Sequence, residues 1–549
     1  MNNTFKKILA VGLTCAMTLS LAACNQDDGG TPSGTNGGNG GGNNSGNGDI
    51  SRLPEETPPP IDTEAPTGHL VYFTYETNFE SASEKLLTKF ETQYGGTIEV
   101  NLCSSSLEYF PQMGTLVTSG SSPDLVRYEW RSFPHGMSYN IYTALDGYID
   151  INSDLWKDMK PLADQFKYNN KYYYFPYQSK TNFAINYNAL TIKEANLEDP
   201  MDLLAQNKWT WSTFEQMLKD WCNKDSNHIG YNGVGGQSFI LTTGKKTIDV
   251  TGDNIINNLK DQDVSRCMQW LEKLRKDGLI GVTEEQNQAT GHTNGYEAPD
   301  AAFVDGNLLF LGMDPSWTYG AAKESLYNKG VDEEMKFVPF PRDDNSDTYY
   351  CGIDTFGYLV PSGAPNVKGA VDWINFLRTE EIDPENIAKA KADAIANTVL
   401  YKSKCANKDC GDTENGDSKG RHIYTEEEKD MTECPVCGTP REEKFKLVWD
   451  SDVYDLWMDM KNATGRFTML FDNGYGFNDD VSKLLREGET PLIDGPVFGD
   501  FSFTQLVEAN YDALEVYLEE YRTLMKQNAA GNLATMPAEN APAGTTAEG

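Results

Sequence analysis

The sequence predicts an α/β fold built around open, mostly parallel sheets. Residues 69–75 form a nearly continuous β-prone run, as in a strand that is covered on both faces. A helix follows, because Leu86, Phe90 and Tyr94 recur on one helical face and Gly95 supplies a stop signal. This strand–helix order then repeats, which is typical of a parallel sheet with helices packed against it.

The repeat continues into a second and a third strand. Alternating apolar residues predict a strand over 97–102, a short helix is expected over 112–119, and a third strand begins within 123–126. The three strands are therefore expected to lie in one sheet.

Three later segments carry helix signals. Ser212 and Glu215 have the spacing of a capping box at the start of a helix. Residues 264–274 present one apolar face and are followed by Gly278 as a stop signal. Apolar residues at helical spacing over 506–524 predict a long terminal helix.

The first 24 residues have the layout of an export signal. Lys6 and Lys7 precede an apolar run over 8–21 that is too short for a stable membrane span. The run ends in Leu21-Ala22-Ala23-Cys24, which resembles the bacterial lipobox, whose cysteine is lipidated and becomes the new N-terminus. The resemblance implies a lipid anchor at Cys24; an ordinary signal peptide is the alternative.

Two segments are too polar and too rich in small residues to form a core. Residues 25–67 are rich in Gly, Asn and Ser and then in Pro, which predicts a flexible tether. Residues 528–549 are expected to form a disordered tail. The tether would hold the folded part away from the membrane and leave it free to turn.

The composition bounds the possible partners. The formal net charge of −36 argues against nucleic acid, because phosphate binding needs a basic surface. Aromatic residues make up 11% of the chain, enough to build a sizeable core. Beyond the signal segment, no run of about 18 apolar residues predicts a further membrane span.

Six short motifs follow one another in an order found in one protein family. They occupy residues 119–126, 170–177, 183–188, 209–214, 302–317 and 357–361. Together they resemble the extracellular solute-binding proteins of ABC importers, family 1, of the sugar-binding type. The resemblance implies a two-lobe, periplasmic-binding-protein-like fold of type II, with open mostly parallel sheets, helices on both faces and a hinge between the lobes.

The resemblance also implies how the chain is divided. Lobe 1 is expected to comprise 68–180 and 348–400, and lobe 2 to comprise 181–340 and 445–527. Residues 401–444 depart from the family pattern and have the character of an insertion.

The ligand is expected between the lobes, at the carboxyl ends of the strands. A sugar ring stacks its apolar face on an aromatic side chain, and its hydroxyls need carboxylate or amide partners. Trp317 lies in a segment similar to the family's Pro-Trp loop, where the tryptophan often stacks on ligand. The predicted ligand-binding residues are Tyr75, Glu76, Asn78, Arg127, Glu129, Trp130, Tyr177, Gln178, Trp317 and Asp354.

A cluster of cysteines predicts a metal site in the inserted segment. Cys405 and Cys410 are followed by Cys434 and Cys437, which enclose two residues and precede a glycine, as in a zinc knuckle. We expect a structural zinc with four thiolate ligands and His422 as a spare ligand; two disulfides or a disordered loop are the alternatives. The scattered cysteines are expected to pack as small hydrophobes: Cys103, Cys222, Cys267 and Cys351.

The leading interpretation is a monomeric, lipid-anchored solute-binding protein on the outer face of a cell membrane, of the kind found in Gram-positive bacteria. It would deliver an oligosaccharide to the permease subunits of an ABC importer, without catalysis and without a functional cofactor. A sugar acid or a peptide stays open as the ligand. The alternatives are a surface glycoside hydrolase or polysaccharide lyase, and a surface adhesion module.

Overall fold

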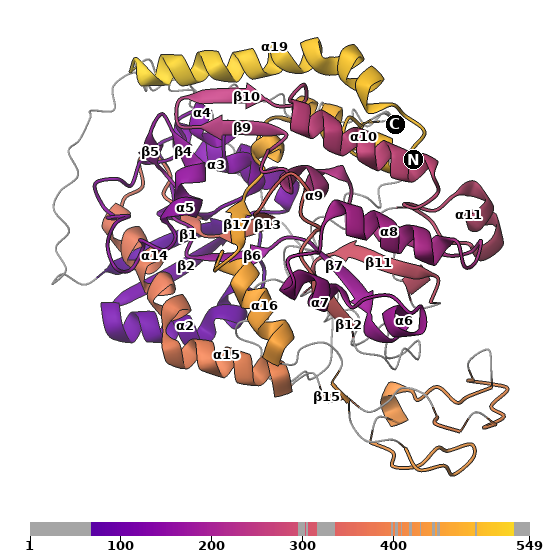
Figure 1. The fold of residues 1–549 in the computed structure, drawn as a ribbon. Coiled ribbons are helices and arrows are strands. Elements are labelled where there is room, and N and C mark those ends of the chain that lie inside the picture. Colours follow the sequence, from indigo (N-terminus) through magenta and orange to yellow (C-terminus); the bar gives the residue numbers. More distant parts are fainter. Residues whose placement is uncertain are drawn as a thin grey trace, which may run out of the picture.

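The computed structural model describes residues 67–531, apart from 295–301, 304–305, 316–334, 397–398, 401–404, 408, 417–419, 429, 442–444, 447–450 and 489–490. Two four-stranded sheets lie side by side with a three-stranded sheet between them (Figure 1). We call them the first sheet, the second sheet and the connecting sheet. The predicted export signal, Cys24, residues 25–66 of the predicted tether and Trp317 lie outside the described residues, and so does the chain beyond Gly531. The predicted start of the disordered tail at 528 is wrong, because the terminal helix continues to Ala529.

The first sheet confirms the predicted strand–helix order. Its strands, in spatial order, are β14 (Tyr358–Leu359), β3 (Leu125–Arg127), β1 (Gly68–Thr74) and β2 (Gly96–Leu102). β1 runs parallel to β2 and β3, whereas β14 runs antiparallel to β3. Helix α2 (Phe79–Tyr94) ends where Gly95 takes a left-handed conformation with φ of 65°, as the stop signal predicted.

The next helix begins earlier than the sequence predicts. α3 covers Ser106–Thr118, and the Ser105 side chain caps it by accepting from the Glu108 backbone N–H. Pro111 lies inside the helix, where it removes one backbone donor without ending the helix. α14 (Val367–Ile382) packs against β1 and α2.

The second sheet is mixed rather than mostly parallel. Its strands, in spatial order, are β12 (Met335–Val338), β7 (Ala184–Asn188), β11 (Leu308–Met313) and β8 (Ile229–Gly233). β8 runs parallel to β11, but β7 runs antiparallel to both β11 and β12. Helices α6 (Ala189–Glu194), α7 (Pro200–Ala205) and α8 (Trp211–Cys222) pack against it.

The predicted capping box at the start of α8 is wrong. Thr210 is the N-cap residue, and both the backbone N–H and the hydroxyl of Ser212 donate to Asp344, at 3.0 and 2.9 Å. Glu215 instead accepts from the indole N–H of Trp270 at 2.9 Å. Partners distant in sequence therefore replace the local pairing. The face predicted within 264–274 is confirmed, since α10 (Gln262–Lys276) buries its apolar side.

The connecting sheet consists of β17 (Phe467–Leu470), β13 (Tyr349–Phe356) and β6 (Gln178–Thr181), in that order. β13 pairs antiparallel with β6 and parallel with β17. α16 (Ser451–Lys461) packs against β6 and β17, and α15 (Pro384–Ala396) packs against α14 and α16. The chain thus passes between the two large sheets through β6 and β13.

The long terminal helix α19 (Phe503–Ala529) runs along the top of the molecule in Figure 1. It contacts α10 and β10 (Asn254–Asn257), which pairs with β9 (Ile248–Thr251), and it also contacts α4 (His135–Ser138). The Tyr521 hydroxyl lies 2.5 Å from His135 Nδ1. The helix therefore touches elements that belong to both halves of the fold.

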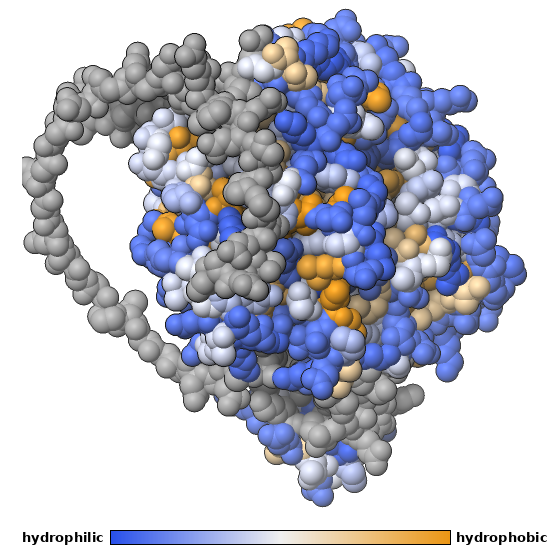
Figure 2. Space-filling view, turned by 90° about the vertical axis from the view of Figure 1, so that its left-hand side faces the viewer, coloured by the Kyte–Doolittle hydropathy of each residue, from blue (hydrophilic) through white to orange (hydrophobic). Residues whose placement is uncertain are grey.

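The surface agrees with the acidic composition. On the face shown in Figure 2 the coloured surface is mostly hydrophilic, and hydrophobic residues gather in a broken band near its middle. Among the residues that the structure describes, no helix has the length and the apolar character that crossing a membrane requires.

Candidate functional site

Four of the predicted ligand residues meet in one charged cluster at the ends of β1 and β3. The guanidinium of Arg127 pairs with the carboxylate of Glu76, and its Nε lies 3.3 Å from Glu129 Oε1. The Tyr75 hydroxyl donates to the same Glu129 oxygen at 2.9 Å. Glu76 and Arg127 are buried, whereas Tyr75 and Glu129 are partly buried. We call these four residues the charged cluster.

The electrostatics of the charged cluster follow from its burial. Burial alone would lower the pKa of Arg127, but the carboxylates of Glu129 and Glu76 raise it above its ordinary value. Burial raises the pKa of Glu129, although Arg127 and the Tyr75 hydroxyl act against that shift. One guanidinium thus compensates two carboxylates, and the cluster depends on that single cation.

Two further predicted residues lie near the same strand ends. Trp130 is partly buried in the turn η2 (Trp130–Ser132), with the Arg131 guanidinium 4.8 Å from its ring centre. Asn78 is exposed at the start of α2, and its side chain makes no cap hydrogen bond there. Trp130 thus offers a partly exposed aromatic surface beside the charged cluster.

The predicted ligand-binding residues Tyr177 and Gln178 lie at the start of β6, where the chain enters the connecting sheet. The Tyr177 ring stacks on Tyr358 with centres 6.3 Å apart, and Tyr358 contacts Tyr72 next to the charged cluster. Burial raises the pKa of Tyr177. The Gln178 amide donates to Glu381 at 2.9 Å. Tyr177 therefore extends the aromatic surroundings of the charged cluster toward the connecting sheet.

A second group of charges links the connecting sheet to the second sheet. Asp354 on β13 pairs in register with Lys180 on β6. Lys180 also forms an ion pair with Asp314, which directly follows β11 of the second sheet. Burial raises the pKa of Asp354 to about 6, with Asp314 adding to the shift and Lys180 opposing it.

Sequence reasoning missed several of these residues. Lys180 and Asp314 are 134 positions apart, so only the folded chain reveals that they pair. Asp314 lies within the motif over 302–317 and Lys180 lies between the motifs over 170–177 and 183–188, which was the available signal. Tyr128 lies between two predicted residues and was passed over.

Two cavities lie elsewhere. One of about 680 Å³ is lined by α10, α11 (Glu284–Thr290) and the loop that follows α11, and one of about 300 Å³ is lined by β9 and Asp164. Neither contains a predicted ligand residue. The predicted residues lie instead at the packed junctions between the sheets.

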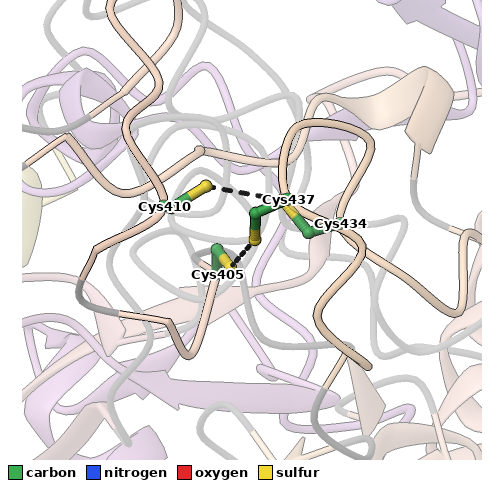
Figure 3. A group of neighbouring side chains, drawn as sticks. All are labelled: Cys405, Cys410, Cys434 and Cys437. Carbon is green, nitrogen blue, oxygen red and sulfur yellow. Dashed lines mark hydrogen bonds between the residues drawn. The ribbon is translucent and has the colours of Figure 1, made fainter.

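The four cysteines of the inserted segment converge on one point (Figure 3). Cys405 and Cys437 have sulfurs 3.5 Å apart, Cys410 and Cys434 have sulfurs 3.6 Å apart, and all four lie within 4.8 Å of one another. Metal–sulfur bonds of about 2.3 Å in a tetrahedron would place sulfurs about 3.8 Å apart. All four are free thiols in the structure, and they could hold a metal ion.

The surroundings of the cysteines support a compact module. Gly438 has a φ of 68° and donates its N–H to the Cys434 carbonyl at 2.8 Å, which closes the turn. Cys405, Cys410, Cys434 and Tyr424 form a small core separate from the main one. The described parts of the segment lie apart from the sheets in Figure 1.

His422 does not face the sulfurs. Its Nδ1 lies 2.5 Å from Asp412 and its Nε2 lies 3.2 Å from Glu428. Two carboxylates therefore occupy both ring nitrogens, and the prediction of a spare ligand is not supported. The scattered cysteines are packed as predicted: Cys103, Cys267 and Cys351 are buried and Cys222 is half-buried.

The chain is similar to known families and structures. The family described as bacterial extracellular solute-binding protein matches residues 85–409. Similar solved structures include a cyclic α-maltosyl-1,6-maltose binding protein from Arthrobacter globiformis, with 13% identity and a TM-score of 0.55, covering 83% of this chain and 100% of that one. No curated protein sequence matches the chain.

Two further structures have a TM-score of 0.50. One is an ABC substrate-binding protein from Listeria monocytogenes in complex with cycloalternan, with 13% identity, covering 82% of this chain and 99% of that one. The other is a sugar transporter from Rhizobium etli in an open conformation, with 16% identity, covering 83% of this chain and 99% of that one. At these identities the likeness establishes the fold, and it confirms the predicted α/β periplasmic-binding-protein-like class.

Proposed function

Because the chain belongs to the bacterial extracellular solute-binding proteins, a family that binds solutes for ABC importers and does not catalyse reactions, we propose that its solute is an oligosaccharide. The main support for this proposal is that charged and aromatic side chains from all three sheets lie at the junctions between those sheets. Lys180, Asp314 and Asp354 connect the second sheet to the connecting sheet. Tyr177 connects the charged cluster to the same region.

The proposed binding mode uses the chemistry of these side chains. Tyr75, Trp130 and Tyr177 offer aromatic faces for stacking on sugar rings, and Glu129 and Asp354 offer acceptors for hydroxyls. In this account 68–180 with 348–400 form one lobe, 181–340 with 445–527 form the other, and the two lobes close on the ligand. Two proteins that share the fold support this class of ligand: the one from Arthrobacter globiformis is a cyclic α-maltosyl-1,6-maltose binding protein, and the structure of the one from Listeria monocytogenes is a complex with cycloalternan.

A thermal-shift screen tests the proposal. The panel comprises maltotetraose, cycloalternan, a galacturonate oligomer and an unrelated peptide, each with purified protein. We expect a neutral oligosaccharide to raise the melting temperature without release of reducing ends. Reducing-end release would indicate a hydrolase, and a shift with the peptide alone would contradict the ligand class.

Two alanine variants refine the site. Trp130→Ala and Trp317→Ala are expected to weaken binding of the shifting oligosaccharide. Unchanged affinity in both variants would mean that the ligand binds away from these strand ends.

The proposed anchor is a lipid on Cys24. The support is the sequence Leu21-Ala22-Ala23-Cys24 directly behind an apolar run. More than one acyl chain would be needed for firm attachment. Metabolic labelling with a fatty-acid probe should mark the wild type and not Cys24→Ala, and equal labelling of both would contradict the proposal.

The proposed occupant of the cysteine site is a structural zinc ion. Four thiolates leave no open position for a reacting water, so the site would stabilise the module rather than perform chemistry. Elemental analysis of protein purified under reducing conditions should find one zinc per chain. Zinc-free protein containing two disulfides would contradict the proposal.

A further inference from the structure

We infer that the Tyr128 hydroxyl and the Asp354 carboxylate form a polar subsite that binds adjacent hydroxyls of a neutral sugar ring. The inference rests on the proposed function and names a specificity-determining pair within it. Tyr128 directly follows β3 of the first sheet, and Asp354 lies on β13 of the connecting sheet. The subsite would therefore lie where these two sheets meet.

The first observation is an unsatisfied hydroxyl. Tyr128 is only 7% exposed, yet no residue in the described part of the chain hydrogen-bonds its hydroxyl. Buried hydroxyls nearly always have a hydrogen-bond partner, because a buried hydroxyl without one has lost the hydrogen bond that it made to water in the unfolded chain. A ligand hydroxyl would supply that partner.

Neighbouring tyrosines show that the protein can satisfy such groups here. The Tyr174 hydroxyl donates to Thr355 at 3.1 Å, and the Tyr142 hydroxyl donates to Ser132 at 3.1 Å. Tyr174 is the residue on which the ring of Tyr128 stacks. The Tyr128 hydroxyl thus differs from those of Tyr174 and Tyr142 in having no hydrogen-bond partner among the described residues, although all three lie in the same part of the fold.

Packing fixes the ring of Tyr128 in place. It stacks on Tyr174 with centres 4.3 Å apart, and the rings of Phe166 and Phe471 meet it edge-on at 5.6 and 6.3 Å. Its backbone N–H donates to the Gly357 carbonyl at 3.0 Å. A hydroxyl held by such contacts loses little freedom when it binds, which favours affinity.

The second observation is an acceptor on the strand that Tyr128 contacts. The Tyr128 backbone N–H donates to Gly357, which directly follows β13, and Tyr174, which stacks on Tyr128, donates to Thr355 on β13. Asp354, the neighbour of Thr355, is partly buried, and within the described ranges no side chain or backbone group donates to its carboxylate. The Tyr128 hydroxyl can donate a hydrogen bond to one sugar oxygen, and the Asp354 carboxylate can accept one from a neighbouring sugar hydroxyl.

The surrounding charges select against acidic ligands. Arg127 is already paired with two carboxylates, and Lys180 is already paired with Asp314. Glu129 and Asp354 would repel a carboxylate on the ligand. The subsite therefore favours a neutral sugar over a sugar acid.

The test compares two tyrosine-to-phenylalanine variants of the full chain. The probe is whichever neutral sugar, maltotetraose or cycloalternan, shifts the wild type most. Tyr128→Phe should weaken its binding roughly 2- to 10-fold, as expected for one hydrogen bond, and should keep or raise the ligand-free melting temperature. The control, Tyr142→Phe, removes a satisfied hydroxyl, so it should lower the ligand-free melting temperature and leave affinity unchanged.

Each contrary result is distinguishable. A ligand-free melting temperature that falls in Tyr128→Phe as much as in Tyr142→Phe would show an internal partner and overturn the inference without any ligand. Unchanged probe affinity in Tyr128→Phe would overturn it while leaving the proposed function standing. Binding of a galacturonate oligomer more tightly than the neutral probe would overturn the stated ligand class, and a panel that never shifts the wild type would overturn the proposed function itself.

Discussion

Replacing Arg127 with methionine should destabilise the folded protein by about 3–5 kcal/mol at pH 8, because it removes one partner of a buried ion cluster. Arg127 and Glu76 have side chains only 6% and 4% exposed, and Glu129 is 11% exposed. Methionine keeps much of the side-chain volume, so the loss reports the uncompensated carboxylates rather than a cavity. The Tyr75 hydroxyl would remain as a partner of Glu129 but could not replace a full charge.

The pH dependence gives this prediction its specific signature. Arg127 now lowers the pKa of Glu129 against the effect of burial, so its removal should raise that pKa further. An acid whose folded pKa is raised binds protons more tightly when folded, and the variant then gains stability relative to the wild type as pH falls. The destabilisation should therefore be clearly smaller at pH 5 than at pH 8.

Urea unfolding followed by circular dichroism at both pH values measures the effect. Lys157→Met is the matched control, because Lys157 pairs with Asp154 at the surface and its loss should stay within about 0.5 kcal/mol. Adding Glu129→Gln to Arg127→Met should recover part of the loss, whereas Glu129→Gln alone should destabilise. A loss below about 1 kcal/mol at pH 8, or an equal loss at both pH values, would refute the reasoning.

Three further predictions concern other titratable groups. Burial raises the pKa of Asp354 from 3.8 to about 6, so wild-type stability falls as pH rises through that window; Asp354→Asn should gain melting temperature over the wild type at pH 8 but not at pH 4. Burial lowers the pKa of His135 from 6.5 to about 4, so the folded protein binds this proton less readily than the unfolded chain and loses stability as pH falls between those values. His135→Gln should therefore flatten the acid side of the curve of stability against pH. Cys410→Ser should lose bound zinc by elemental analysis while the main melting transition stays unchanged, because the cysteine core is separate from the main core; a large shift of that transition would contradict this.

Local signals were enough to place much of the fold. The apolar spacing before Gly95 and the alternation after it marked α2 and β2, because period and backbone conformation are properties of the neighbouring residues themselves. The capping box predicted at the start of α8 was wrong, because Ser212 donates its hydrogen bonds to Asp344, which is distant in the sequence. The prediction of mostly parallel strands was wrong for the second sheet, because the direction of a strand depends on how the chain leaves the connecting sheet.

The site shows the same division. Cysteine spacing predicted that four sulfurs would meet, and they do. Arg127 and Glu129 were predicted as ligand-binding residues from their place at the end of a strand; the structure pairs them with each other, and their contact with a ligand stays a prediction. Tyr128 between them could not be singled out, because only its tertiary packing shows that the hydroxyl is buried without a partner.

Small-angle X-ray scattering with and without a binding oligosaccharide tests most directly whether the two halves of this fold close around a solute. We predict a smaller radius of gyration when saturating maltotetraose, cycloalternan or another oligosaccharide that raises the melting temperature is present. Scattering that stays the same with every sugar that binds would contradict the account.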